Sequence, residues 1–76
     1  MTRPPLEEMK ASALALAKKR APRPVLIGEV AMHLGWWATL NETEALLEDM
    51  LKDGTLRRPT KAEYKEYGVR FGYIAV

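Results

Sequence analysis

The residues best suited to chemistry in this 76-residue chain are cations, and they gather with aromatic residues in its last third. Tyr64 and Tyr67 lie among these basic side chains. Lysine and arginine can neutralise phosphate charge, and a tyrosine hydroxyl can donate to a phosphate oxygen. The pattern predicts nucleic-acid contacts by the following residues: Arg57, Arg58, Lys61, Lys65 and Arg70. The alternative is a solvated hairpin whose charges keep an edge strand from pairing.

A second basic group, Lys18-Lys19-Arg20 and Arg23, follows the first apolar stretch of the chain. Cations are favoured in the last turn of a helix because they interact with the helix dipole. This structural explanation covers only about half of the group, and it does not cover Arg23, which lies between two prolines. Lys18 and Lys19 are also candidates for nucleic-acid contact.

The charge is segregated along the chain, although the net charge is only +2. Both ends are basic, whereas 29–54 is acidic and carries a single lysine. A carboxylate near a phosphate is repulsive, so any nucleic-acid function must accommodate this acidic middle.

Several kinds of chemistry find no support in the sequence. There are no cysteines and one histidine, His33, so we expect neither a disulfide nor a metal site. No set resembles a nucleophile with its base and orienting group, and no glycine-rich phosphate loop occurs. We expect a protein that is not an enzyme and needs no cofactor.

The distribution of apolar residues bears on the expected location of the protein. No apolar run approaches the ~20 residues of a membrane span, and the N-terminus lacks a signal-type apolar stretch. These observations predict a cytoplasmic protein with no membrane partner.

The elements that would position these residues begin with two helices in one domain spanning 1–76. The first helix is predicted over 5–20, with 1–4 loosely ordered. The signals are two prolines at its start, acidic residues in its first turn, an apolar stripe along one face and a basic last turn. A second stripe closed by Gly35 predicts a short helix over 28–34, with His33 on its outer face.

A third helix follows, with two possible starts. Thr39-Leu-Asn-Glu42 and Asn41-Glu-Thr-Glu44 are competing capping boxes. Apolar residues then recur at helical spacing until Gly54, which we expect to end the helix with a positive φ. The predicted core residues of the chain are Leu16, Val30, Leu34, Leu46, Leu47, Met50, Leu51 and Leu56.

Two β-strands are expected after this helix. The stretch 55–58 is ended by Pro59, and 69–76 is rich in strand-forming residues. The connection 59–68 contains a capping box and Gly68, so it can hold one helical turn. Of the adjacent Trp36 and Trp37, we expect one in the core and one at the surface, because neighbours cannot point the same way.

Two local patterns carry a resemblance to a known family. Ile27-Gly-Glu-Val-Ala-Met-His-Leu-Gly35 resembles the first helix of the winged helix-turn-helix pair. Leu46-Leu-Glu-Asp-Met-Leu-Lys-Asp-Gly-Thr-Leu-Arg57 resembles the end of the recognition helix and the first strand of the wing. The resemblance covers about 10–76 and implies an α+β, mostly α-helical domain: three helices closed by a small antiparallel β-hairpin wing.

The resemblance implies a DNA-binding protein that acts as a transcription regulator. In the family the third helix enters the major groove, where Asn41 would pair with adenine, Ala45 would meet a thymine methyl and Glu48 would accept from cytosine. A lone module makes few base contacts, so a homodimer is part of this hypothesis.

A minority of such domains bind proteins, which gives the competing hypothesis. An adaptor or inhibitor would use the acidic third helix, through Glu48 and Asp49, and an exposed Trp37 to bind a basic protein.

Overall fold

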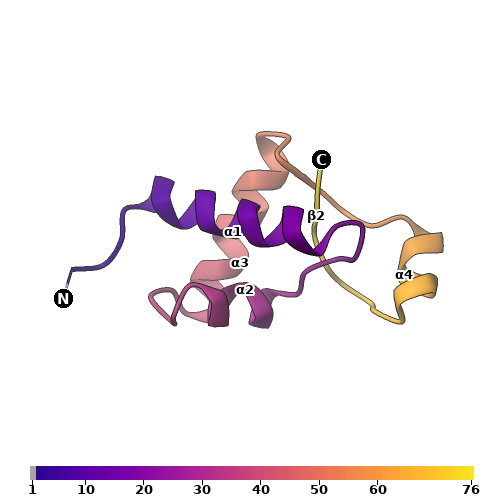
Figure 1. Ribbon diagram of the computed structural model, residues 1–76, viewed down its shortest axis with the longest axis horizontal. Helices are drawn as coiled ribbons and strands as arrows, with labels where there is room; N and C mark the ends of the chain where they lie inside the picture. Colours follow the sequence, from indigo (N-terminus) through magenta and orange to yellow (C-terminus); the bar gives the residue numbers. More distant parts are fainter. Residues whose placement is uncertain (1) are drawn as a thin grey trace.

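A computed structural model describes residues 2–76 and contains four helices and two short strands across them. In chain order the elements are α1 (Leu6–Arg20), α2 (Ile27–His33), α3 (Leu40–Lys52), β1 (Leu56–Arg57), α4 (Lys61–Tyr67) and β2 (Ile74–Ala75). Figure 1 shows α1 across the domain, α2 below it, α3 crossing behind, and α4 standing apart at the right. The domain is therefore α+β and mostly helical, as the sequence predicts.

Local capping explains where the helices begin. Thr39 Oγ1 accepts from the Glu42 N–H at 3.2 Å, and the Glu42 carboxylate accepts from the Thr39 N–H at 3.0 Å. Thr39 rather than Asn41 therefore caps α3. α1 and α2 lie within one residue of their predicted bounds. Met1, part of the segment expected to be loosely ordered, lies outside the described residues.

The sheet joins the end of the chain to two earlier segments. β1 and β2 are antiparallel, with Leu56 opposite Ala75 and Arg57 opposite Ile74. On the other side, Val25 and Tyr73 exchange backbone hydrogen bonds at 2.8 and 3.0 Å. The connection between α1 and α2 is thus tied to the C-terminal segment.

The connection between the strands is a helix rather than a tight turn. Thr60 and Glu63 form a reciprocal capping box, and Gly68 ends α4 with φ +64°. The final strand is shorter than the expected 69–76, and β2 spans only two residues. Gly72 passes so close to Pro24 that an added Cβ would lie 2.7 Å from the Pro24 Cβ.

The core lies where α1, α2 and α3 meet beneath the sheet. All but one of the predicted core residues are buried; Leu51 is partly exposed. Leu6 continues the apolar stripe of α1 in the sequence but is 50% exposed in its first turn. Val25 and Tyr73 are fully buried, because their backbone pairing draws both side chains inward.

The prediction that one tryptophan enters the core is wrong. Trp36 is 58% exposed and Trp37 is 37% exposed. Gly35 and Trp36 have positive φ values of 66° and 61°, which turn the chain sharply after α2. The small Ala38, 2% exposed, occupies the inward position that follows this turn.

Two further properties of the described residues bear on function. No helix among residues 2–76 combines the length and apolar character that a membrane crossing requires. Within the same residues, no group of three or more metal-ligating side chains lies close enough together to hold an ion.

The fully buried Leu47 provides the first prediction. Replacing Leu47 with Ala leaves a cavity between the helices and should lower the free energy of unfolding by about 2–5 kcal/mol, measured by urea denaturation. Leu6→Ala, at a half-exposed position, should change it by less than about 0.5 kcal/mol. Equal effects of the two substitutions would show that the core is wrongly assigned.

Gly54 and Gly28 form a matched pair for the second prediction. An added Cβ meets no atom within 4 Å at either site, but Gly54 has φ +84° whereas Gly28 lies within α2. Gly54→Ala should therefore destabilise by about 1–2 kcal/mol through backbone strain alone. Gly28→Ala should be neutral or stabilise by up to about 1 kcal/mol. Thermal melting of both variants tests this, and an unchanged melting temperature for Gly54→Ala would contradict it.

Candidate nucleic-acid interface

The exposed face of α3 is acidic along most of its length. Glu44 and Asp49 are exposed on it, and Glu48 is half-buried. Asn41 and Ala45, the other residues expected to read bases, are exposed near the start of the helix. The residues expected to contact base edges thus lie on the outer side of one helix, but carboxylates surround them.

The two arginines that follow α3 are held by carboxylates. Arg57 donates from both terminal nitrogens to Glu63, at 2.8 and 3.0 Å. Arg58 donates to both oxygens of Glu48, at 2.9 and 3.1 Å. A phosphate contact by either arginine would compete with an existing ion pair, and Glu48 is likewise engaged.

Arg58 is also fixed by aromatic rings. Its guanidinium carbon lies 4.5 Å from the centre of the Phe71 ring and 5.1 Å from that of Tyr73. These two rings meet edge to face at a centroid distance of 5.7 Å. Burial raises the pKa of the Tyr73 hydroxyl, and the charge of Glu48 acts in the same direction. The Arg58 side chain therefore joins α3 to the segment before β2.

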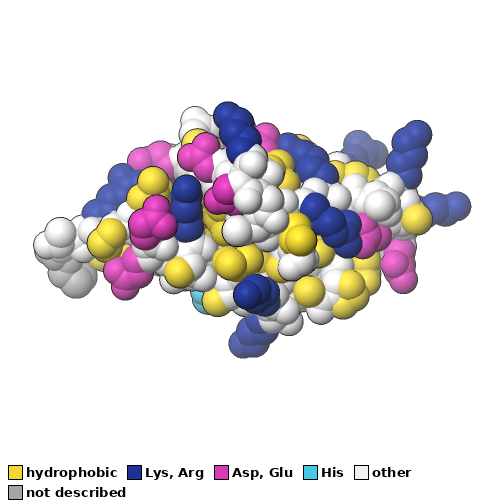
Figure 2. Space-filling model, turned by 90° about the horizontal axis from the view of Figure 1, so that it is seen from above, with side chains coloured by type: hydrophobic (Ala, Val, Ile, Leu, Met, Phe, Trp, Pro, Cys, Tyr) yellow, Lys and Arg dark blue, Asp and Glu magenta, His cyan; other side chains and the backbone are white. Residues whose placement is uncertain are grey.

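Six other cations lie on the last turn of α1, on the two segments joined by the Val25–Tyr73 pairing and on α4, and we call this surface the basic end: Lys18, Lys19, Arg23, Lys61, Lys65 and Arg70. All six are exposed, and none forms an ion pair with another residue of the described chain. Figure 2 shows acidic side chains mostly over the left half, and basic side chains over both halves but most densely toward the right, where some acidic side chains also lie.

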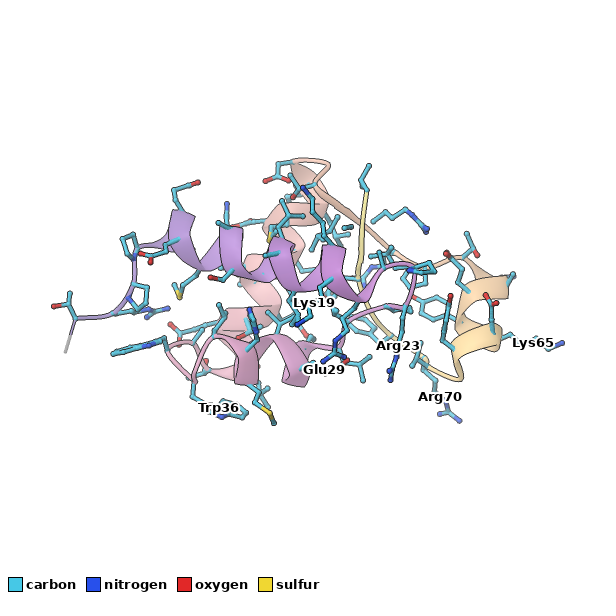
Figure 3. The ribbon with its side chains drawn as sticks, viewed as in Figure 1. Lys19, Arg23, Glu29, Trp36, Lys65 and Arg70 are labelled. Carbon is cyan, nitrogen blue, oxygen red and sulfur yellow. The ribbon has the colours of Figure 1, made fainter. Side chains whose placement is uncertain are left out.

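The cations of the basic end come from segments that lie far apart in the sequence. The end of α1 carries Lys18 and Lys19, and the Val25–Tyr73 pairing holds the segment with Arg23 beside the segment with Arg70. In Figure 3 the side chains of Lys19, Arg23 and Arg70 point to the lower side, whereas Lys65 projects outward from α4. The cations therefore form a broad surface rather than a single pocket.

The residues of the competing hypothesis lie on different segments. Asp49 and Glu48 are neighbours on α3, whereas Trp37 lies in the turn before this helix, beside Gly35. Sequence reasoning placed only one tryptophan at the surface and so missed one exposed ring. The available signal was the Gly35-Trp36 junction, because a glycine that ends a helix can leave the following residue outside the core.

No protein-family model matches the chain, and no curated protein or solved structure matches it significantly.

The ion pair between Arg57 and Glu63 provides the third prediction. The Arg57 guanidinium and the Thr60 N–H lower the pKa of Glu63 from 4.5 to about 2. Because the folded-state pKa is the lower one, the stabilisation is complete above pH 4.5 and is lost as the pH falls towards 2. Across this interval the free energy of unfolding should therefore decrease more steeply for the wild type than for Glu63→Gln.

Urea denaturation at a series of pH values measures this difference. Glu66→Gln is the control, because Glu66 is exposed on the same helix and forms no ion pair within residues 2–76. The control should keep the wild-type pH dependence. Parallel curves for the wild type and Glu63→Gln would show that the ion pair adds no stability in solution.

Proposed function

We propose that this chain is a small winged helix-turn-helix domain that binds duplex DNA and regulates transcription. The observation that carries the proposal is the basic end, where six cations without ion-pair partners in the described chain are exposed on neighbouring segments. Such a surface gains affinity by releasing the counterions condensed on DNA.

The element order supports the winged-helix assignment. Three helices precede β1, and the segment between α1 and α2 pairs with the C-terminal segment, which also pairs with β1. In this interpretation α3 is the recognition helix and the β1–β2 connection is the wing. The wing then contains α4, which carries Lys61 and Lys65.

Electrostatics suggest how such a domain would lie on DNA. The carboxylates of α3 repel phosphates, so deep insertion of its whole length would be costly. Contacts from the basic end would supply most of the affinity, and only Asn41 and Ala45 at the start of α3 would approach base edges. This arrangement predicts weak sequence discrimination by a single copy.

The salt dependence of binding gives the fourth prediction. Removing one cation that neutralises a phosphate should reduce the slope of log Kd against log salt by about one unit, for every DNA sequence alike. We therefore expect Lys65→Ala and Arg70→Ala each to have this effect, measured by fluorescence anisotropy with labelled duplex DNA. Arg57→Ala should lower the slope less, because Glu63 already holds this arginine.

Lys52→Ala is the matched control, because Lys52 is an exposed cation at the end of α3, away from α4 (Figure 1). It should leave the slope unchanged. The paired Glu48→Gln and Asp49→Asn substitutions should strengthen binding by removing repulsion. No detectable wild-type binding at ~50 mM salt, where electrostatic affinity is high, would exclude the proposal.

The exposure of Trp36 and Trp37 favours a second candidate, an adaptor or inhibitor that binds a basic protein. In that case the acidic face of α3 would carry the binding energy. The paired amide substitutions at Glu48 and Asp49 would then weaken the complex instead of strengthening it, and the basic-end substitutions would have little effect.

A further inference from the structure

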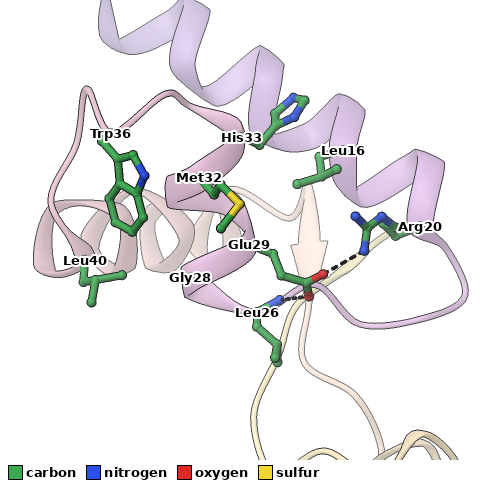
Figure 4. Close-up of a pocket in the computed structure, with 9 residues that line it drawn as sticks. All are labelled: Leu16, Arg20, Leu26, Gly28, Glu29, Met32, His33, Trp36 and Leu40. Carbon is green, nitrogen blue, oxygen red and sulfur yellow. Dashed lines mark hydrogen bonds and ion pairs between the residues drawn. The ribbon is translucent and has the colours of Figure 1, made fainter.

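A hollow of about 650 Å³ lies on the outer face of α2, between the end of α1 and the start of α3 (Figure 4). Its apolar lining comes from α1, the residue before α2, α2 itself, the following turn and the start of α3: Leu16, Leu26, Met32, Trp36 and Leu40. The hollow does not involve α4, and it reaches α3 only at Leu40, the first residue of that helix.

The lining is unusually exposed for apolar side chains. Met32 is 66% exposed, Trp36 58% and Leu40 51%, and all three border the same hollow. Methionine and aromatic residues are enriched in protein interfaces relative to the rest of the protein surface. The face therefore has the composition of an interface.

The charges differ between the two ends of the hollow. At one end Arg20 and Glu29, which both line the hollow, form an ion pair of 2.7 Å. Lys19, the neighbour of Arg20 in the last turn of α1, is exposed and unpaired within the described residues. At the other end Leu40 begins α3, and Glu44 follows one turn later on the same side of the helix. Glu44 is also exposed and unpaired among residues 2–76. The surface bordering the hollow thus carries an unpaired basic residue near the end of α1 and an unpaired acidic residue near the first turns of α3.

We propose that a second copy of this chain docks on this face in a two-fold symmetric dimer. In such an interface the same patch serves both subunits, so a patch that is basic at one end and acidic at the other is complementary to its own inverted copy. Each Met32 and Trp36 fills the hollow of the other subunit, and each Lys19 lies near Glu44 of the other subunit. Each subunit thus contributes the same apolar residues and the same two charged residues to the interface.

The dimer rests on the proposed function and deepens it, because it presents two basic surfaces to one DNA duplex, each formed by the five cations of the basic end other than Lys19. Its assembly is nevertheless independent of DNA and can be measured without it. A monomeric protein that binds DNA would contradict only the dimer, and a dimer that ignores DNA would contradict only the DNA-binding proposal.

The dimer is tested by sedimentation velocity without DNA, at protein concentrations from about 1 μM to about 1 mM. We expect a concentration-dependent monomer–dimer equilibrium. Met32→Glu should raise the dimer Kd by at least about 30-fold, the effect of losing an interface hot spot. Leu6→Glu is the matched control, since Leu6 is similarly exposed but lies outside the hollow. It should leave the Kd unchanged, and circular dichroism should show both variants folded.

A charge exchange tests the orientation of the two subunits. Lys19→Glu and Glu44→Lys should each raise the dimer Kd, because each places like charges opposite one another. The double variant should recover most of the affinity, because the opposite charges meet again with their positions exchanged. A wild-type protein that stays monomeric at about 1 mM would overturn the proposal, as would equal weakening by Met32→Glu and Leu6→Glu.

Discussion

The structure depends above all on the backbone pairing of Val25 with Tyr73. These residues lie far apart in the sequence, yet two hydrogen bonds join them and both side chains are completely buried. The pairing closes the C-terminal segment onto the helices and aligns it for pairing with β1. It also sets Arg23 and Arg70 at the same end of the domain, so a core constraint determines where the surface charge gathers.

The ion pairs divide the cations into two groups with different roles. Arg57 and Arg58 connect β1 to α4 and to α3 through carboxylates, and Arg58 also packs on two rings. Surface ion pairs contribute little stability individually, but paired arginines are less available to an external anion. The lysines at the end of α1 and on α4 have no such partner in the described chain. The basic composition alone therefore does not distinguish the cations that are available to bind an external anion.

Sequence periodicity predicted the helices well, because apolar spacing, Thr39, Thr60 and the glycines at helix ends are local signals. The long-range features were not predictable in the same way. Val25 and Tyr73 are buried where they pair with each other, and Gly72 closely approaches Pro24 just before this pairing. The pairing of Glu48 with Arg58 likewise depends on the path of the chain after α3, so the sequence suggested a base-reading role for a residue that is engaged in an ion pair.

The isolation of α4 has a consequence for how this domain can diversify. No residue of α4 is fully buried; the helix has its own caps and one ion pair, and Tyr64 and Tyr67 are partly buried. Selection can therefore alter its length, charge and outer residues with little effect on the packing of the three core helices. The exposed residues of α4, unlike Glu63, can therefore vary while the scaffold of the three core helices stays constant.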